Sequence, residues 1–205
     1  MPIFHRRSDP PPESDYRRYK QALREDFQHR CAYCILHEGD PYGGGFHHFQ
    51  IDHFRPREHF PELRNTYSNL YYACSWCNRA KSDTWPSDDE ERRGFVFVDP
   101  CVEDLYTTHT TLNPATGKLN PKTNAGDFTI TEIRLNRGMF NQLRKKRVEA
   151  QDEIENTRAR ILRLETEQHP PTETIASLKE KIAQLDEKYI NPKIPYEPTG
   201  LLVDN

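Results

Sequence analysis

Residues 74–83 read CSWCNRAKSD, a pair of cysteines two residues apart that runs directly into polar and cationic side chains. A second pair with the same spacing, CAYC, occupies residues 31–34. Together they supply four thiolates, which suit the tetrahedral preference of a structural zinc ion and leave no position open for substrate. The sequence therefore predicts a structural zinc site, with four unrelated reduced core cysteines as the alternative. Its ligands are Cys31, Cys34, Cys74 and Cys77.

Composition limits what can surround this site. The chain has 205 residues, 30% of them charged and 34% hydrophobic, enough for one domain with an appendage or two small domains. A formal net charge of -3 lacks the basic excess of most nucleic-acid-binding domains, so such a contact needs a local basic patch. Five cysteines, an odd number, favour metal ligands in a reducing compartment over disulfides, and Cys101 is then a small buried hydrophobe. Because we find neither a membrane-length apolar run nor a secretory signal, we expect a cytoplasmic protein without membrane contact.

Residue spacing predicts the elements around the cysteine pairs. Apolar side chains recur at helical intervals before the first pair, with Ser14 or Asp15 as the N-cap. Aromatic and branched runs bounded by turn-forming residues indicate strands. In chain order we expect a helix within 14–30, a strand at 46–51, a short helix or turn at 66–74, a loop at 82–94, a short strand at 95–100 and a hairpin at 106–119 that turns at Pro114 to Gly117.

The last third of the chain changes character. From Thr131 to Gln168 there is no proline and one glycine, and apolar residues recur at heptad positions. Pro170 and Pro171 end this stretch, and a second apolar stripe runs from Ile175 to Tyr189. Two apolar stripes joined by a proline turn predict an antiparallel helical hairpin.

Residues 51–57 read IDHFRPR and place an acid next to a histidine. On a strand, Asp52 and His53 face opposite sides, but at a strand end or in a bent loop they can serve one site from two directions. A carboxylate suits a hard ion such as Mg²⁺, and a neutral imidazole is the usual general base near pH 7. Taken alone, this dipeptide is better explained by a surface or core histidine.

Further polar residues follow this dipeptide in the sequence and could contribute to the same site. Asn69 can hold backbone or orient an imidazole, Asn78 can offer a carbonyl oxygen to a cation, and Lys81 can contact phosphate. Each also has an ordinary explanation. Asn69 could be a turn residue or helix cap, Asn78 could close the turn of the second cysteine pair, and Lys81 could lie on the solvated surface. Arg55 and Arg57 are candidate phosphate contacts in a nucleic-acid-binding site, or solvated surface.

In the order CAYC, IDHFRPR, YSNL, CSWCNRAK, the chain resembles the HNH, or ββα-metal, endonuclease family in its four-cysteine zinc variant. The resemblance implies an α+β fold with a ββα-metal core stapled by zinc and followed by the helical hairpin. The motif covers residues 31 to about 83, and together with the change of composition in the last third it predicts a nuclease domain with its N-terminal helix at 1–130, and a coiled-coil-like hairpin with a C-terminal tail at 131–205. Three short motifs are similar to HNH proteins encoded beside ATPase partners in retron and Septu-type phage-defence systems. They are FVDP at 97–100, IRLNR at 133–137 and LRKKR at 143–147.

The same resemblance implies roles for single residues. Asp52 matches the metal-binding acid, His53 the general base that activates water, and Asn69 the residue that holds the loop of the base. Asn78 stands where many members have a final histidine, and Lys81 matches a lysine that contacts phosphate. Because Asn78 binds metal through oxygen, the catalytic ion is expected to be Mg²⁺ or Mn²⁺ rather than zinc or nickel.

The sequence thus predicts a metal-dependent endonuclease that hydrolyses phosphodiester bonds in DNA and acts with an ATPase partner in bacterial anti-phage defence. The partner is expected to bind the helical hairpin or another surface. Two alternatives are a zinc-stapled nucleic-acid-binding module without catalysis and an interaction protein that docks through its hairpin. The complete set of polar residues favours the enzyme over the binding module, which has no use for that combination.

Overall fold

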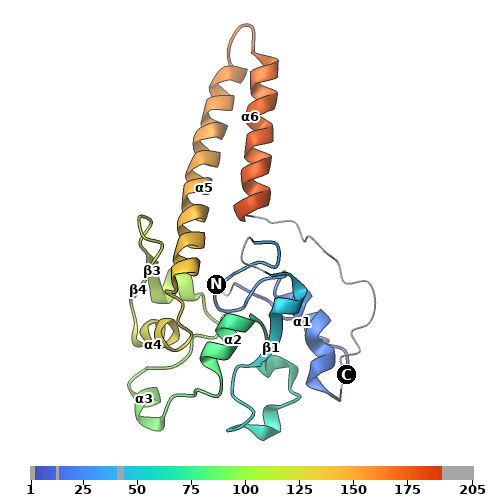
Figure 1. Ribbon diagram of the computed structural model, residues 1–205, viewed down its shortest axis with the longest axis vertical. Helices are drawn as coiled ribbons and strands as arrows, with labels where there is room; N and C mark the ends of the chain where they lie inside the picture. Colours follow the sequence, from blue (N-terminus) through green and yellow to red (C-terminus); the bar gives the residue numbers. More distant parts are fainter. Residues whose placement is uncertain (1–2, 13, 41–43, 191–205) are drawn as a thin grey trace.

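The computed structural model describes residues 3–12, 14–40 and 44–190. Figure 1 shows a body of short helices and strands from which a long pair of helices projects. The strands are β1 (Phe49–His53), β2 (Leu70–Cys74), β3 (Thr110–Leu112) and β4 (Leu119–Pro121). The helices are α1 (Lys20–Asp26), α2 (Ser75–Lys81), α3 (Asp88–Arg92), α4 (Asn124–Glu132), α5 (Gly138–Glu165) and α6 (Thr172–Leu185). The predicted α+β class is confirmed.

The centre of the body is a ββα unit. Strands β1 and β2 pair antiparallel, with Asp52 opposite Tyr71 and His53 opposite Leu70, and β2 runs directly into α2. All five residues of β2 are buried, and the rings of Phe27, Tyr33 and Phe54 pack against Tyr71 in its middle. This burial explains an error of the sequence analysis: the predicted helix or turn at 66–74 is one 3₁₀ turn followed by a strand.

The N-terminal segment packs the body together. Asp15 caps the predicted helix, which begins as a 3₁₀ turn and continues as α1. After α1 the residues Gln28 and His29 adopt positive φ angles, which end the helix and turn the chain toward Cys31. The helix therefore delivers the first cysteine pair to the core, as the sequence predicts.

Two segments after α2 differ from the sequence predictions. The stretch at 82–94, expected to be a loop, contains α3, whose capping box joins Ser87 and Glu90. The stretch at 95–100, expected to be a strand, forms none: its Phe97 packs on Phe128 of α4 at 4.9 Å. Its backbone bonds a side chain instead of a neighbouring strand, since Val98 N donates to Thr129 Oγ1 at 2.9 Å.

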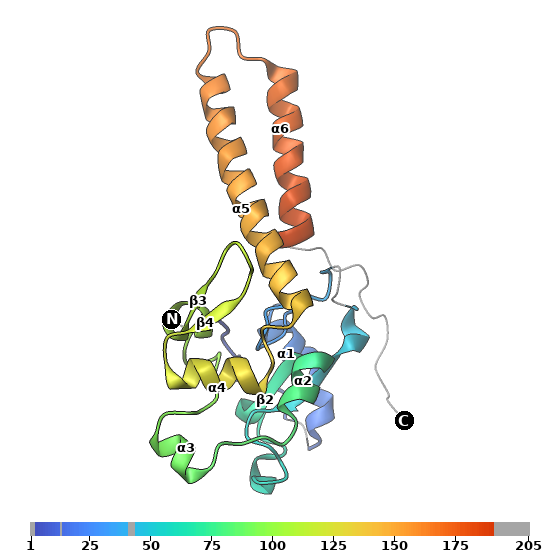
Figure 2. The ribbon, with the colours of Figure 1, turned by 60° about the vertical axis from the view of Figure 1, so that its left-hand side comes forward.

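The predicted hairpin at 106–119 is confirmed as β3 and β4. Gly117 in its turn has a φ of 70°, and a Cβ there would lie 1.9 Å from the backbone oxygen of Asn141, so only glycine fits. Arg144 of α5 donates to the Gly117 carbonyl at 2.7 Å. Figure 2 shows the result, with the β hairpin lying beside the lower end of α5.

Helices α5 and α6 form the predicted antiparallel hairpin (Figures 1 and 2). The expected single helix from Thr131 is interrupted, because α4 ends at Glu132 and Arg134 has a positive φ of 56° before α5 begins. At the base of the hairpin, Arg147 donates to Asp40 at 2.6 Å, which ties α5 to the loop after the first cysteine pair. The domain boundary at 130/131 stays a prediction, and the predicted tail beyond residue 190 lies outside the described residues. None of the described helices has the length and apolar character needed to cross a membrane.

Candidate metal centres and active site

The four paired cysteines meet in the core. All four are buried, and their sulfur atoms lie within 4.8 Å of one another. The Sγ atoms of Cys34 and Cys74 are 3.7 Å apart, well beyond the roughly 2.05 Å of a disulfide. Tetrahedral zinc with bonds of about 2.3 Å places its sulfur ligands about 3.8 Å apart, so the spacing and chemistry of the cluster fit zinc. The predicted four-cysteine cluster is present.

Burial alone works against thiolates at this cluster. It raises the pKa of Cys34 and of Cys77 well above the ordinary thiol value, whereas at Cys31 hydrogen bonds with the other three cysteines outweigh burial and lower the pKa. A divalent cation among the sulfurs would reverse that tendency, since metal-bound cysteines are deprotonated. The fifth cysteine, Cys101, lies outside the cluster and is half-buried, close to the small hydrophobe predicted for it.

Asp52 lies at the end of β1 and is 4% exposed. Its Oδ2 accepts a short hydrogen bond from the hydroxyl of Tyr33 and lies 3.4 Å from Nζ of Lys81. Burial raises the pKa of Asp52, while the Lys81 ammonium acts in the opposite direction. The acid predicted to bind metal is thus held firmly on one of its two oxygens.

Lys81 does not lie on the solvated surface that its alternative explanation required. The side chain is fully buried, and Nζ donates to the backbone oxygen of His53 at 2.7 Å in addition to its contact with Asp52. One ammonium therefore joins α2 to the last two residues of β1. In this geometry Lys81 holds the acid and the base next to each other.

His53 has one ring nitrogen engaged. Its Nε2 lies 2.9 Å from the backbone oxygen of Arg64, and because a carbonyl can only accept, Nε2 carries the proton. The lone pair is then on Nδ1, which is the atom able to take a proton. Burial lowers the pKa of His53 below its ordinary 6.5, so the ring is neutral near pH 7. The ring of Tyr16 packs edge-on at 4.7 Å and limits how the imidazole can turn.

Asn69 closes the loop that follows His53. Its Oδ1 accepts from Arg55 N at 2.9 Å, and its Nδ2 donates to the Arg55 backbone oxygen at 3.0 Å. Its own backbone oxygen accepts from Phe54 N at 2.9 Å. Three bonds to consecutive residues fix the chain where it leaves β1, and this loop also carries the Arg64 carbonyl that orients His53.

Asn78 lies on α2, one turn before Lys81, so both side chains face β1. Its Nδ2 donates to Gln50 Oε1 at 2.8 Å, which leaves Oδ1 as the amide oxygen able to bind a cation. Asp52, His53 and Asn78 all line one pocket of about 440 Å³. The arrangement therefore gathers a carboxylate, a neutral imidazole and an amide oxygen around a common space.

The three predicted phosphate contacts separate in the structure, and Lys81, fully buried and outside the lining of the pocket, is not placed to contact phosphate there. Arg57 lines the pocket, where it pairs with Glu58 at 3.0 Å. Arg55 instead lies over the rings of Phe60 and Trp85, at 5.4 and 5.6 Å from their centroids. Arg79 of α2 is exposed and also lines the pocket.

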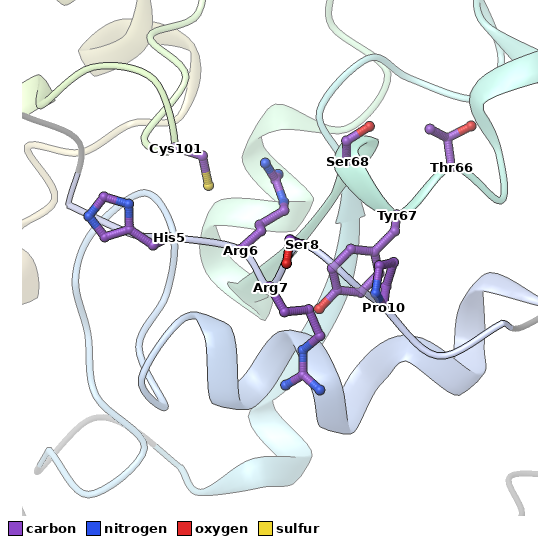
Figure 3. Close-up of a pocket in the computed structure, with 9 residues that line it drawn as sticks. All are labelled: His5, Arg6, Arg7, Ser8, Pro10, Thr66, Tyr67, Ser68 and Cys101. Atoms are coloured by element: carbon purple, nitrogen blue, oxygen red, sulfur yellow. The ribbon is translucent and has the colours of Figure 1, made fainter.

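A second pocket of about 610 Å³ lies along the N-terminal segment (Figure 3). Figure 3 shows Arg6 pointing toward Cys101 and Ser68, and Arg7 pointing to the other side. Both cations already have structural partners: Arg6 stacks on the Tyr71 ring at 4.1 Å, and Arg7 pairs with Asp26 at 2.8 Å. Although this pocket is the larger, it holds neither an acid–base pair nor a predicted site residue.

Comparison with known proteins agrees with this geometry. Residues 31–84 match the model of the HNH endonuclease family, and this segment contains both cysteine pairs and the whole ββα unit. The chain therefore carries an HNH domain, as its sequence motifs predict.

The chain is also similar to the Septu protein PtuA of Bacillus mycoides (strain KBAB4). The two are 26% identical over 147 residues, which cover 61% of this chain and 20% of that protein. The chain thus spans about a fifth of the length of this relative. No solved structure matches the chain significantly.

Sequence reasoning did not find every residue of the site. Tyr33 was missed, although its hydroxyl bonds the predicted metal-binding acid, because an aromatic residue inside a cysteine pair is most simply explained as packing. Gln50 was missed because it carries no charge and precedes the motif. Tyr16, whose ring packs edge-on against His53, was also missed, because it is one of the apolar residues that recur at helical intervals before the first cysteine pair.

Proposed function

We propose that the pocket between β1 and α2 hydrolyses phosphodiester bonds of DNA with the help of a divalent ion. The observation that carries the proposal is that Asp52, His53 and Asn78 line one pocket with complementary chemistry. The acid and the base lie on β1, and the amide oxygen lies on α2. The match of residues 31–84 to HNH endonucleases supports the same reaction.

His53 is the general base of the proposed reaction. Its Nε2 proton is held by the Arg64 carbonyl, so Nδ1 is the atom that takes a proton from the attacking water. The lowered pKa keeps the ring neutral, and therefore basic, near pH 7. Asn69 keeps the loop that carries Arg64 in place, so it acts on the base through the backbone.

Asp52 and Asn78 are the proposed ligands of the catalytic ion. Both offer oxygen, which suits Mg²⁺ or Mn²⁺, and two protein ligands leave most coordination positions to water and phosphate. When bound, such an ion neutralises the charge that develops on the phosphate and the leaving oxygen. A small ligand set also implies weak affinity for the free ion.

The positive residues at the pocket support a nucleic-acid substrate. Arg57 and Arg79 line the pocket, and Arg55 lies on the loop after β1 that Asn69 holds in place. They form the local basic patch that a chain with an overall charge of -3 needs in order to bind nucleic acid. Lys81 is proposed to act on the substrate through its hold on Asp52 and the His53 backbone.

The similarity to the Septu protein PtuA supports a role in anti-phage defence in the bacterial cytoplasm. The nuclease is proposed to act there with an ATPase partner. The hairpin α5–α6 is the proposed contact for that partner, because it projects from the body and leaves most of its surface exposed (Figure 1).

The test is cleavage by the purified full-length chain. Plasmid DNA, single-stranded DNA and RNA are incubated with the zinc-loaded protein in the presence of Mn²⁺, Mg²⁺ or EDTA. We expect cleavage of DNA with Mn²⁺ or Mg²⁺ and none with EDTA. Cleavage that persists in EDTA would contradict the metal-dependent mechanism, and selective cleavage of RNA would contradict the assigned substrate.

A further inference from the structure

Tyr33 connects the cysteine cluster to the proposed active site. It lies between Cys31 and Cys34 and is 2% exposed. Its hydroxyl donates to Oδ2 of Asp52, the acid assigned to the catalytic ion. A single side chain thus reaches from inside the first cysteine pair to the end of β1.

The position of the Tyr33 ring is strongly constrained. It stacks on Tyr71, with ring centroids 6.2 Å apart and planes 10° apart. Its backbone oxygen accepts from the hydroxyl of Tyr106 at 2.9 Å. The preceding residue, Ala32, donates its backbone N–H to Tyr72 O at 2.8 Å. With a cysteine of the cluster on each side, the hydroxyl has almost no freedom to leave Asp52.

The contacts of Asp52 are concentrated on one oxygen. Both the Tyr33 hydroxyl and the Lys81 ammonium contact Oδ2, and no described group donates to Oδ1. Asp52 lines the pocket, so Oδ1 is the oxygen available to a cation there. A carboxylate fixed on one oxygen loses less freedom when the other binds metal, and such outer hydrogen bonds commonly raise metal affinity 10- to 100-fold.

We propose that Tyr33 is a positioning residue for the catalytic ion, which makes the cysteine cluster part of the active-site framework. The proposal deepens the proposed function and rests on the assignment of Asp52 as a metal ligand. It gives the first cysteine pair a role beyond folding: the pair sets the position of a hydroxyl that orients the acid.

The test is the affinity of zinc-loaded, full-length protein for Mn²⁺, measured by titration calorimetry on wild type and Tyr33→Phe. We expect Tyr33→Phe to bind Mn²⁺ about 10- to 100-fold more weakly. In cleavage assays the Mn²⁺ concentration for half-maximal rate should rise by a similar factor, while the rate at saturating Mn²⁺ changes little. Zinc content should stay at the wild-type value.

Tyr71→Phe is the matched control. It removes a buried tyrosine hydroxyl that also bonds a carboxylate, Asp99 at 2.6 Å, and its ring is the one stacked on Tyr33. Asp99 is outside the pocket of Asp52 and His53. Wild-type Mn²⁺ affinity in Tyr71→Phe therefore separates the hydrogen bond to Asp52 from a general loss of core packing.

Three further variants separate the possible failures. If Asp52→Asn loses Mn²⁺ binding while Tyr33→Phe binds like wild type, the role of Tyr33 is overturned and the metal site stands. If Asp52→Asn also binds like wild type, the metal assignment itself is overturned.

Tyr33→4-aminophenylalanine keeps a hydrogen-bond donor and should restore the affinity for Mn²⁺. If it binds Mn²⁺ as weakly as Tyr33→Phe, donation to Asp52 is not the cause. Should Tyr33→Phe lose zinc, Tyr33→4-fluorophenylalanine, which fills the hydroxyl space without donating, gives the same readout.

Discussion

The ββα core and the α5–α6 hairpin are held together in different ways. In the core, buried polar groups meet: Lys81 bridges Asp52 and the backbone of His53, and against β2 the Arg24 side chain of α1 pairs with Glu38 at 2.9 Å. In the hairpin, one seam of apolar side chains is buried and the ion pairs are exposed. The seam consists of Ala150, Ile154, Ile161 and Ile175, whereas Phe140 and Leu143 at the start of α5 pack in the core of the body.

This difference shows which region fixes the positions of its polar atoms most tightly. Buried charges must be paired and hydrogen-bonded, so each core contact fixes both distance and orientation. Exposed pairs such as Lys179 with Glu165 contribute little, and an apolar seam fixes position without aiming a polar atom. The core is therefore suited to chemistry, and the hairpin to presenting a surface. Substitutions in the two regions should have different consequences.

The largest effect is expected at the cysteine cluster. Cys74→Ser removes a buried thiolate from the proposed zinc site, and zinc binding in small domains contributes roughly 10 kcal/mol or more to folding. We expect loss of zinc by mass spectrometry and collapse of the near-ultraviolet circular dichroism of the aromatic core. Cys101→Ser, outside the cluster, should keep both. A stable Cys74→Ser protein with a native spectrum and no zinc would contradict the account of the core.

The buried ion pair should give the next largest effect. Lys81→Met leaves the Asp52 carboxylate in the core without its cation, which typically costs about 3 to 5 kcal/mol. The measurement is the free energy of unfolding in urea without added Mn²⁺. Arg79→Met, exposed on the same helix, should change it by less than about 0.5 kcal/mol. Equal effects of the two variants would show that Lys81 does not support the site as proposed.

A substitution in the hairpin seam should destabilise the hairpin and leave the ββα core unchanged. Ile154→Ala opens a cavity at a side chain that is 2% exposed and should cost about 2 to 4 kcal/mol. Hydrogen exchange should rise along α5 and α6, while zinc content and the protection of β2 stay at wild-type values. Leu162→Ala, on the same helix but 66% exposed, is the control with almost no effect. Loss of protection in β2 would argue against the predicted division of the chain into two parts.

Much of this comparison could be predicted from the sequence. The two cysteine pairs, the order of the polar motifs and the proline turn between apolar stripes indicated the cluster, the ββα unit and the hairpin. The spacing within each cysteine pair and the apolar stripes of the hairpin are local, so a short window of sequence contains their physical cause, whereas the ββα unit followed from the resemblance to HNH endonucleases. The pocket also gathers Asp52, His53 and Asn78, as their assigned roles require.

The failures have tertiary causes. β2 was assigned as a helix or turn because a strand that is buried on both faces shows no alternation of apolar and polar residues. FVFVDP at 95–100 has strand-forming residues, but packing on α4 replaces a neighbouring strand. The Tyr33 hydroxyl and the burial of Lys81 depend on residues 19 and 29 positions away from Asp52, and no local pattern encodes such a meeting.

The central claim is that the pocket between β1 and α2 is a metal-dependent nuclease site with His53 as its base. The most direct measurement is Mn²⁺-dependent cleavage of plasmid DNA by His53→Ala beside wild type, with zinc content and melting temperature measured on both. His109→Ala, which changes a histidine outside the pocket, is the control and should cut like wild type. We predict that His53→Ala loses Mn²⁺-dependent cleavage while it keeps its zinc and fold, and undiminished cleavage by His53→Ala would contradict the claim.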